Sequence, residues 1–366
     1  MKILHIGQVI GGLDVYIRNI IAHSDDKVEF VIVKGDQDNS PPIVRNNIPI
    51  KEYKIRLYRS VNPFKDLTGL TQILKIIKKE SPDAIHCHSA KGGFLGRIAG
   101  YLTRTKTFYT PHAFSFLADE PGLKQKTFLY LEKAVIFNSK LLACSNSELK
   151  LGIDVVGYEG KNALVWSNSV PDVSGFSQET APVDGPYICY VGRPSFQKNS
   201  FFLLEVIKKT VVKHPNLRFY MIGVGFHSPD LDELEDAIKK NKLENHFILL
   251  PWLSQFETFR YVKHSLFYLT VSRYEGLPLS VLEALSLGKA IVASDVFGNV
   301  DCVDHGVNGY LLPLQVDVFA EKIGELVVDS VKLQMFEQNS RNKFLNEFHI
   351  DKQIGLLNDI YANNND

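Results

Sequence analysis

Two glutamates, Glu275 and Glu283, stand eight positions apart within Ser272–Gly288, which reads SRYEGLPLSVLEALSLG. The apolar run before this stretch predicts a buried strand, the Gly and Pro after Glu275 predict a loop, and Ser280–Leu287 predicts a helix that ends at Gly288. In an open α/β sheet this order places the loop and the first-turn N–H groups of the helix at the carboxyl edge, where anionic ligands bind. We therefore expect Glu275 in a ligand-binding loop and Glu283 one turn into the helix.

Each glutamate also has a simpler interpretation. Ser280 followed three residues later by Glu283 matches a capping box, in which the carboxylate satisfies only a backbone N–H. Glu275 lies between an aromatic residue and Gly-Leu-Pro, where it caps nothing, so it is either a surface acid or a ligand contact. The residues alone leave both alternatives open.

Two cations follow another predicted strand. Arg193 and Lys198 come after Tyr187–Val191 and before a helix predicted from about Ser200 to His214. Five residues apart on a strand-end loop, they are able to converge on one diphosphate, Arg as a fork and Lys as a point charge. The alternative is that both are ordinary surface charges.

The first half offers similar positions. Gly12 precedes a predicted helix, where its N–H is free for a phosphate or hydroxyl oxygen, although the residues alone favour a plain turn at Gly11-Gly12. Lys91 and Arg97 follow the predicted strand Ala84–His88, with Gly92-Gly93 read as a loop before a helix, an edge suited to an oxyanion. His112 follows a further strand and is either a polar loop residue or a site residue.

Metal sites are not expected. His86-Cys87-His88 invites a zinc interpretation, but strand alternation turns Cys87 away from the two histidines. Asp36-Gln37-Asp38 lies in a polar run typical of a solvated turn.

Composition bounds the class of protein. The 366 residues include 41 basic and 41 acidic residues, with 45% hydrophobic and 22% charged, which are globular values that give no nucleic-acid signal. Met1–Val170 holds 23 basic and 16 acidic residues, leaving 18 and 25 for the rest, so the first half favours an anionic surface or ligand. The basic runs Lys51–Arg59 and Leu74–Lys79 point the same way, or form a solvated face.

Four cysteines without paired spacing indicate a reducing compartment. The sequence shows neither a signal peptide nor an apolar run of about 18 residues, so we expect a cytoplasmic protein, with a peripheral position on the inner face of the cell membrane as an option. Alternating strand and helix patterns predict two α/β domains at 1–171 and 186–348, a linker at 172–185, and a last helix at about 349–366.

The glutamate spacing within SRYEGLPLSVLEALSLGKAIVASD resembles the signature of family-4 retaining glycosyltransferases of the GT-B fold. Five more stretches match in order: GQVIGGLDVYIRNI, HCHSAKGGFLGRIAG, YTPHAFSF, YVGRPSFQKN and DHGVNGYLLP. Two departures are Asp301, where relatives often have Glu, and Asn168-Ser169-Val170-Pro171, which lacks the usual Gly.

The resemblance implies two Rossmann-like, doubly wound domains facing across a cleft, the first on the acceptor side and the second binding the nucleotide sugar. The C-terminal helix would cross back onto the first domain. Such an enzyme moves a sugar from a nucleoside diphosphate sugar, here by preference a UDP-sugar, to a growing polysaccharide or lipid-linked saccharide. It keeps the anomeric configuration and needs no metal or other cofactor.

The resemblance also assigns roles. Arg193 and Lys198 would stabilise the leaving diphosphate, Glu283 would hold the ribose, and Glu275 would bind the transferred sugar. His112 would contact the donor sugar, with Gly12 and the anion-side residues His88, Lys91 and Arg97 in the first domain. The nucleobase would dock near Trp252, which is alternatively a core residue, and the remaining donor contacts would be the backbone of Gly276, Leu277, Pro278 and Leu279. A nucleotide-sugar epimerase and a non-catalytic sugar-binding protein remain as alternatives.

Overall fold

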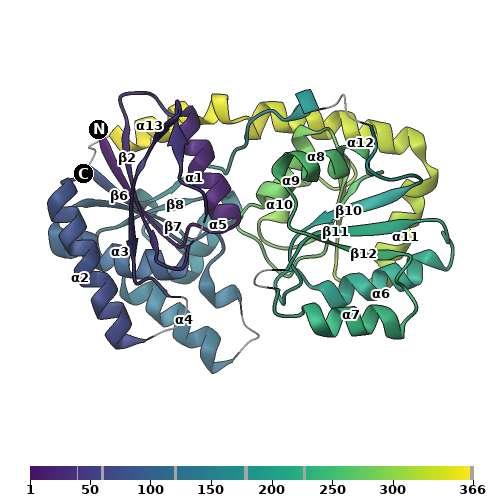
Figure 1. The fold of residues 1–366 in the computed structure, drawn as a ribbon, viewed down its shortest axis with the longest axis horizontal. Helices are drawn as coiled ribbons and strands as arrows, with labels where there is room; N and C mark the ends of the chain where they lie inside the picture. Colours follow the sequence, from purple (N-terminus) through teal and green to yellow (C-terminus); the bar gives the residue numbers. More distant parts are fainter. Residues whose placement is uncertain (39, 59–61, 119–121, 177–179, 226–227, 363–366) are drawn as a thin grey trace. The chain divides into compact units, whose positions relative to one another are not determined.

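The computed structural model describes residues 1–38, 40–58, 62–118, 122–176, 180–225 and 228–362. The chain forms two compact units, Met1–Ser169 with Ile350–Asp366, and Val170–His349. Each unit is an α/β structure built on a parallel sheet (Figure 1), which confirms the predicted fold class. The last helix belongs to the first unit, as the resemblance implied. Four residues of that predicted segment, 363–366, lie outside the described residues.

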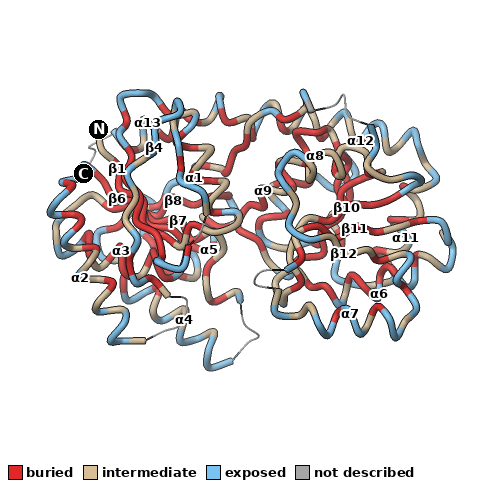
Figure 2. The backbone as a smooth tube through the Cα atoms, viewed as in Figure 1, coloured by how far each residue is buried: buried red, intermediate tan, exposed pale blue. Residues whose placement is uncertain are grey.

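The first unit centres on a seven-stranded sheet with strand order β5-β2-β1-β6-β7-β8-β9. Its strands are β1 (Lys2–Ile6), β2 (Glu29–Gly35), β5 (Lys51–Ile55), β6 (Ala84–His88), β7 (Lys106–Thr110), β8 (Lys140–Ala143) and β9 (Ala163–Val165). A small antiparallel pair, β3 (Val44–Arg45) and β4 (Ile48–Pro49), stands apart. The central strands β1 and β6 are buried along nearly their whole length, their histidines included, and Figure 2 shows the central strands as the red centre of the unit.

The helices of this unit are α1 (Gly12–His23), α2 (Pro63–Glu80), α3 (Ser89–Thr103), α4 (Leu123–Ala134), α5 (Asn146–Leu151) and α13 (Ile350–Ala362), with shorter helical turns at Ser115–Leu117, Gly152–Val156 and Gly160–Asn162. Helix α2 starts where Asn62 accepts a hydrogen bond from the Lys65 N–H and Pro63 follows. Helix α13 packs against α1.

Helix α3 begins at Ser89, so Gly92 and Gly93 lie inside it, and the predicted glycine loop is wrong. The glycines are there for close packing on the sheet. A Cβ on Gly93 would lie 2.1 Å from the Tyr109 ring, and one on Gly96 would lie 2.3 Å from Cys87 Sγ. Tertiary packing therefore outweighs the cost of about 1 kcal/mol that each helical glycine carries.

The second unit holds a six-stranded parallel sheet in the order β12-β11-β10-β13-β14-β15. Its strands are β10 (Tyr187–Val191), β11 (Arg218–Val224), β12 (Phe247–Pro251), β13 (Tyr268–Thr270), β14 (Ile291–Ser294) and β15 (Gly309–Leu312). The helices are α6 (Ser200–Val211), α7 (Leu231–Lys240), α8 (Gln255–His264), α9 (Leu279–Ser286), α10 (Asn299–Cys302), α11 (Val316–Val328) and α12 (Ser330–Lys343), with short turns at Ser174–Phe176 and Phe344–Phe348.

The sequence of Phe319–Phe348 has a helical pattern, and the structure is helical there, as α11, α12 and the turn Phe344–Phe348 with a break at Asp329. Asp329 ends α11 and caps α12, because its side chain accepts a hydrogen bond from the Lys332 N–H. Asp172, in the segment that we expected to be a linker, forms a bidentate ion pair with Arg341 of α12, at 2.8 and 2.5 Å. This part of 172–185 is therefore fixed to the second unit, while 177–179 lie outside the described residues.

Candidate active site

Glu275 lies in the loop between β13 and α9 and is 7% exposed. Its Oε1 accepts hydrogen bonds from Lys198 Nζ at 2.6 Å and from Ser272 Oγ at 2.7 Å, and its Oε2 accepts one from Gln197 Nε2 at 3.2 Å. The alternative that Glu275 is a surface acid is therefore wrong. Three donors, one of them charged, hold a nearly buried carboxylate in one orientation.

The strand order brings Lys198 to Glu275. Strand β10 neighbours β13, so the loops that follow these two parallel strands meet at the same carboxyl edge. Gly192 leaves room for the lysine, since a Cβ there would lie 3.2 Å from Lys198 Cδ and Cε. The loops are also joined by the Arg273 N–H, which donates to the Gln197 carbonyl at 2.8 Å. The arrangement is a preformed, nearly neutral ion pair at the edge of the sheet.

The loop after β14 supports Glu275 from a third strand. The Glu275 N–H donates to the Phe297 carbonyl at 3.0 Å. Gly298 follows with a φ of 84°, and a Cβ at this position would lie 2.8 Å from Glu275 Cβ and 2.7 Å from the Gly276 carbonyl oxygen. Only glycine fits both the left-handed backbone and this close approach.

Glu283 does not form the capping box. Pro278 caps α9 without a side-chain hydrogen bond, so Ser280 is already the second helical residue. Glu283 Oε1 instead accepts a hydrogen bond from Gln255 Nε2 of α8 at 3.3 Å. Burial raises the pKa of Glu283 to about 7, against the opposing effect of the Gln255 hydrogen bond. Glu283 is therefore a carboxyl group poised to lose its proton near neutral pH.

The other expected donor contacts of this unit surround the pair of glutamates. Arg193 is half-buried on the loop after β10, and Gly276, Leu277 and Pro278 are buried while Leu279 opens α9 half-buried. Trp252 follows β12 and is 63% exposed, so the core alternative for this residue is wrong. Each stands at the carboxyl edge where the resemblance placed it, and the role of each stays a prediction.

In the first unit, His112 follows β7 and is half-buried. His112 and Ala113 both have left-handed backbones, with φ of 53° and 79°, which is strained for residues other than glycine. Glu148 of α5 holds this conformation. Its Oε1 accepts a hydrogen bond from the Ala113 N–H and its Oε2 one from the Cys144 N–H, both at 2.8 Å. The geometry at His112 is thus imposed by a buried carboxylate.

Behind His112 lies a histidine cluster of His5, His86 and His88, all fully buried. His88 was expected to face a ligand; this is wrong, because it is enclosed and its Nδ1 lies 3.2 Å from His112 Nε2. Cys87 points to the other face, towards Gly96, as strand alternation predicted.

The cluster brings three imidazoles within metal-ligand reach of one another. However, His5 Nδ1 lies 2.8 Å from His88 Nε2, which is a hydrogen-bond distance, whereas two nitrogens on one tetrahedral zinc stand about 3.3 Å apart. His86 has both nitrogens engaged, with the Tyr361 hydroxyl at 2.7 Å and the Thr110 hydroxyl at 2.8 Å. The cluster fits a hydrogen-bonded group better than a metal site.

Two cations predicted on the anion side are not available to a ligand. Arg97 is 1% exposed, lies over the Tyr109 ring at 3.8 Å and donates to Glu132 Oε2 at 2.7 Å. Burial opposes its charge, but Tyr158, Glu132 and Tyr109 outweigh it and raise the pKa of Arg97. Lys91 is also nearly buried, and both carboxylate oxygens of Asp66 neutralise it at 2.8 and 2.9 Å. Both predictions are wrong, because α3 packs these residues inward.

Gly12 is exposed at the start of α1, directly after Gly11, which has a φ of 64°. A Cβ on Gly12 would meet nothing within 4 Å in this structure, so packing does not require a glycine there. The ligand contact at Gly12 stays a prediction.

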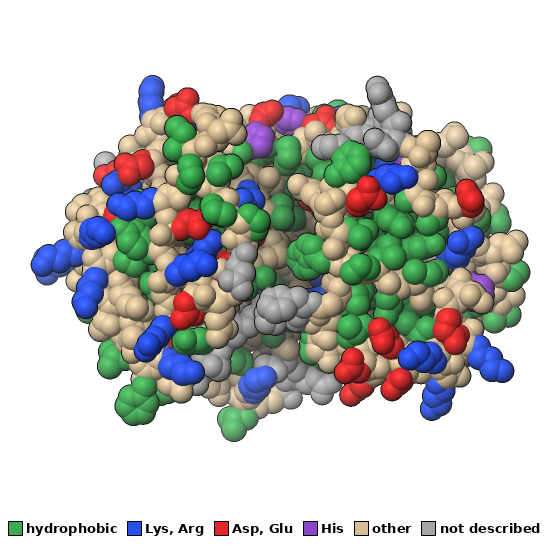
Figure 3. Space-filling model, viewed as in Figure 1, with side chains coloured by type: hydrophobic (Ala, Val, Ile, Leu, Met, Phe, Trp, Pro, Cys, Tyr) green, Lys and Arg blue, Asp and Glu red, His purple; other side chains and the backbone are tan. Residues whose placement is uncertain are grey.

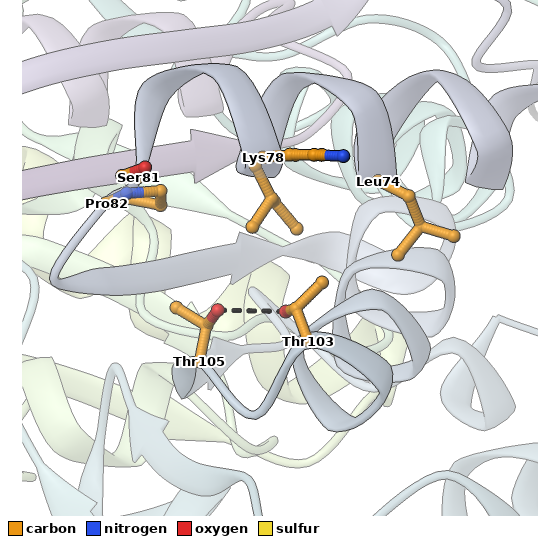
Figure 4. Close-up of a pocket in the computed structure, with 7 residues that line it drawn as sticks. Leu74, Lys78, Ser81, Pro82, Thr103 and Thr105 are labelled. Carbon is orange, nitrogen blue, oxygen red and sulfur yellow. Dashed lines mark hydrogen bonds between the residues drawn. The ribbon is translucent and has the colours of Figure 1, made fainter.

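The open groove in Figure 4 lies elsewhere. Its lining includes Lys78 at the end of α2 and the hydrogen-bonded pair Thr103 and Thr105. These residues precede β6 and β7, so the groove is at the amino edge of the sheet. The histidines stand at the opposite, carboxyl edge.

Sequence reasoning missed four residues: Ser272, Gln197, Glu148 and His5. The first two lie inside motifs already noted, and their hydrogen bonds to Glu275 depend on side-chain geometry. Glu148 does carry a signal in the sequence, because it follows Ser145 by three residues, which is the spacing of a capping box. In the structure Ser145 caps α5 and accepts a hydrogen bond from the Glu148 N–H. His5 carries none, since it is one residue of an apolar strand.

Comparisons with known proteins point to glycosyltransferases. A family model described as glycosyl transferases group 1 matches residues 175–343, and one described as glycosyl transferase 4-like domain matches residues 11–151. The UDP-Gal:alpha-D-GlcNAc-diphosphoundecaprenol alpha-1,3-galactosyltransferase of Escherichia coli is 27% identical over 363 residues, covering 91% of each chain.

Solved structures share the fold. Sucrose-phosphate synthase from Thermosynechococcus elongatus aligns with a TM-score of 0.82 at 18% identity, covering 99% of this chain and 98% of that one. Anabaena HepE in complex with UDP and glucose aligns with a TM-score of 0.77 at 18% identity, covering 99% of both.

The fold and the matched models define a GT-B glycosyltransferase. The chain belongs to the family-4 type of these enzymes. Within the described residues, every helix is too short or too polar to cross a lipid bilayer.

Proposed function

We propose that the protein transfers a sugar from a nucleoside diphosphate sugar, by preference a UDP-sugar, to a growing polysaccharide or lipid-linked saccharide, with retention of anomeric configuration. The observation that carries this proposal is the Glu275 cluster, a nearly buried carboxylate tied to Lys198 at the carboxyl edge, directly before α9. The UDP in the HepE structure and the UDP-Gal donor named for the Escherichia coli relative support the choice of nucleotide.

The chemistry follows from the charges. When the bond between the sugar and the diphosphate breaks, negative charge grows on the phosphates and positive charge grows at the anomeric carbon. Lys198, Arg193 and the first-turn N–H groups of α9 stabilise the former, and Glu275 the latter. Lys198 Nζ lies 2.6 Å from Glu275 Oε1, so the site holds a positive and a negative group side by side. Neither charge has to be supplied by the solvent.

Donor binding and sugar contact fall to other residues. Glu283 accepts hydrogen bonds from the ribose hydroxyls, and Trp252 lies against the nucleobase. The backbone of 276–279 approaches the phosphates. His112 contacts the transferred sugar, and Gly12 gives the ligand access to the start of α1.

We further propose that transfer needs no metal, because Lys198, Arg193 and the α9 N-terminus already supply the positive charge that a divalent ion would provide.

The acceptor is proposed to be a lipid-linked saccharide, presented at a membrane. The Escherichia coli relative is named for an undecaprenol-linked acceptor. Helix α4 carries exposed Leu123 and Tyr130 beside exposed Lys124 and Lys126. Figure 3 shows blue Lys and Arg side chains over the first unit, with green apolar groups among them. Such a surface suits weak, salt-sensitive binding of a cytoplasmic protein to anionic lipid.

The structure bears on whether the two basic runs, Lys51–Arg59 and Leu74–Lys79, are able to contact a membrane. Lys51 is paired with the buried Glu80 at 2.7 Å, so its charge is partly neutralised. Lys75, Lys78 and Lys79 of the second run are exposed on α2. Arg59 of the first run lies outside the described residues.

A donor screen tests the proposal. The protein is incubated with each of several UDP- and GDP-sugars, with and without a diphosphoundecaprenyl-linked sugar, and released nucleotide is measured. We expect acceptor-dependent release with one UDP-sugar, and a product whose anomeric configuration matches the donor by NMR. Conversion of donor without acceptor would indicate an epimerase, and binding of donor without turnover would indicate a sugar-binding protein.

Membrane binding is tested separately. Sedimentation with vesicles containing anionic lipid should be strong at low salt, weak at high salt, and reduced in Lys124→Glu/Lys126→Glu. Equal binding to neutral vesicles would remove the anionic surface from the proposal.

A further inference from the structure

Three histidines from different parts of the first unit form a hydrogen-bonded series that ends at the candidate site. His5 of β1 contacts His88 of β6 through Nδ1 and Nε2, 2.8 Å apart. His88 in turn contacts His112 through Nδ1 and Nε2, 3.2 Å apart. His5 and His88 are fully buried, and His112 is half-buried at the strand end. The series therefore runs from the core of the sheet to its carboxyl edge.

Each ring of this series is neutral. Burial lowers the pKa of His5 and of His112 to about 3. Burial, together with the neighbouring histidines, lowers the pKa of His88 well below its usual value. A neutral imidazole carries one N–H, so His88 donates through only one of its nitrogens.

This leaves two arrangements of protons. In the first, His5 Nδ1–H donates to His88 Nε2, and His88 Nδ1–H donates to His112 Nε2, so that the proton of His112 is on Nδ1. In the second, every bond is reversed, and His5 Nε2 carries its proton. The three rings must switch together, because a change in one bond forces the proton of His88 to its other nitrogen.

The environment of His5 distinguishes the two arrangements. His5 Nε2 is buried and has no hydrogen-bond partner among the described residues. The second arrangement would place an N–H there, and buried N–H groups without a partner are rare in folded proteins, rarer than acceptors that lack a donor. The first arrangement leaves only a bare ring nitrogen at this position.

We propose that His5 and His88 are positioning residues that hold His112 in the Nδ1–H tautomer, so that it presents a hydrogen-bond donor to the ligand. The backbone fits this role, because Glu148 holds the strained turn at His112 and Ala113, and Tyr16 packs edge-on against the His112 ring at 4.7 Å. No residue of the described chain hydrogen-bonds His112 Nδ1. A fixed donor is suited to a sugar hydroxyl or phosphate oxygen. The effect on catalysis, unlike the tautomer itself, rests on the proposed function.

The tautomers are measured by two-bond ¹H–¹⁵N correlation NMR of the full chain labelled with ¹⁵N-histidine, at pH 7.5. The His112 signals are assigned by their loss in His112→Gln. We expect the wild-type protein to show His5, His88 and His112 as neutral Nδ1–H tautomers. His112 in the Nε2–H form would overturn the proposal, and the tautomer is read from the spectrum of the wild-type protein.

Variants of His88 then test the coupling. In His88→Phe, His112 should show a mixture of tautomers, and kcat should fall by roughly fivefold, because only the fraction carrying the donor acts. In His88→Asn the amide nitrogen lies near the position of Nδ1 and donates to His112, so the tautomer should persist and kcat should stay within about twofold of wild type. An unchanged His112 spectrum in His88→Phe would overturn the coupling.

His86→Phe is the matched control. It is buried on the same face of the same strand, but its nitrogens bond Tyr361 and Thr110 and not His112. We expect lower stability with an unchanged His112 tautomer. Stoichiometric metal in the purified protein, lost in His5→Phe, would replace the proposal with a metal site. Correct tautomers without transfer from any donor would refute the proposed function and leave the histidine series standing.

Discussion

Glu283 gives the candidate site a pH dependence that the substitution Glu283→Gln should remove. Burial raises its pKa from 4.5 to about 7, so the ionised form is disfavoured in the folded protein. Stability from this group is fully present below pH 4.5 and is lost as the pH rises through about 7. At about 1.4 kcal/mol for each pKa unit, the loss reaches about 3 kcal/mol above pH 8. Glu283→Gln should therefore be more stable than wild type at pH 8 and similar to it at pH 4.5.

Donor binding should have the opposite pH dependence. Ribose hydroxyls donate to a carboxylate, so the donor prefers ionised Glu283 and lowers its pKa on binding. One pH unit below the pKa of the free protein, affinity falls about tenfold, which predicts roughly tenfold weaker binding at pH 6 than at pH 8. Glu283→Gln should bind donor more weakly than wild type at pH 8 and show no such change.

Isothermal titration calorimetry between pH 5.5 and 8.5 measures the affinity, and urea unfolding measures the stability. A UDP-sugar is the right ligand, because free UDP has a terminal phosphate that itself titrates near pH 6. His112, with a pKa of about 3, does not titrate in this window. The control is Glu321→Gln, which removes a 75% exposed carboxylate of the same unit. If wild type bound donor equally at pH 6 and 8, or if Glu283→Gln kept the pH dependence, the ribose assignment would be refuted.

Four further outcomes are expected. Lys198→Met should lower kcat about 100-fold and cost about 1–3 kcal/mol of stability, because it leaves Glu275 without its cation. Adding Glu275→Leu to this variant should restore stability against urea but should not restore turnover. Arg193→Ala should also slow nucleotide release about 100-fold with donor saturating, and near-normal turnover would end its assignment to the diphosphate. Arg97→Met should cost about 3–5 kcal/mol of stability, because it leaves Glu132 charged and buried, and the KM of the folded fraction should be unchanged. A changed KM at normal stability would indicate that Arg97 contacts the ligand. Transfer should persist in excess EDTA, and recovery of a lost activity by added divalent ion would contradict the metal-free chemistry.

Local patterns were sufficient to predict most of the fold. Strand β10 begins and ends where its apolar run does, and the alternation in β6 correctly turned Cys87 away from its neighbours. The start of α3 was not predictable in this way. Glycines at 92 and 93 favour a loop by local propensity, and only the close contact with Tyr109 explains why they lie in a helix. Once the helix starts at Ser89, Arg97 turns inward, so one misplaced boundary produced the wrong role.

The sequence was sufficient to predict which loops carry the residues of the candidate site, but not which of these residues contact one another. Lys198 and Glu275 are 77 positions apart, and His5 and His88 are 83 apart, so no spacing links them. What links them is strand order, because β10 pairs with β13 and β1 pairs with β6.

In both units, contacts from a neighbouring strand or its loop fix a side chain at the carboxyl edge of the sheet. A side chain at the carboxyl end of a parallel strand would be mobile on its loop alone. In the second unit, Lys198 from the neighbouring strand fixes Glu275 by an ion pair. In the first, His88 fixes His112, and His5 from the neighbouring strand fixes His88. An ion pair suits the site where charge develops during transfer, whereas a neutral series suits a site that must bind a hydroxyl without adding charge. This difference between the ion pair and the neutral histidine series leads to two predictions. Substitutions at Lys198 should act mainly on kcat, and their effect should depend on salt. Substitutions at His88 should act through the tautomer of His112, and their effect should not depend on salt.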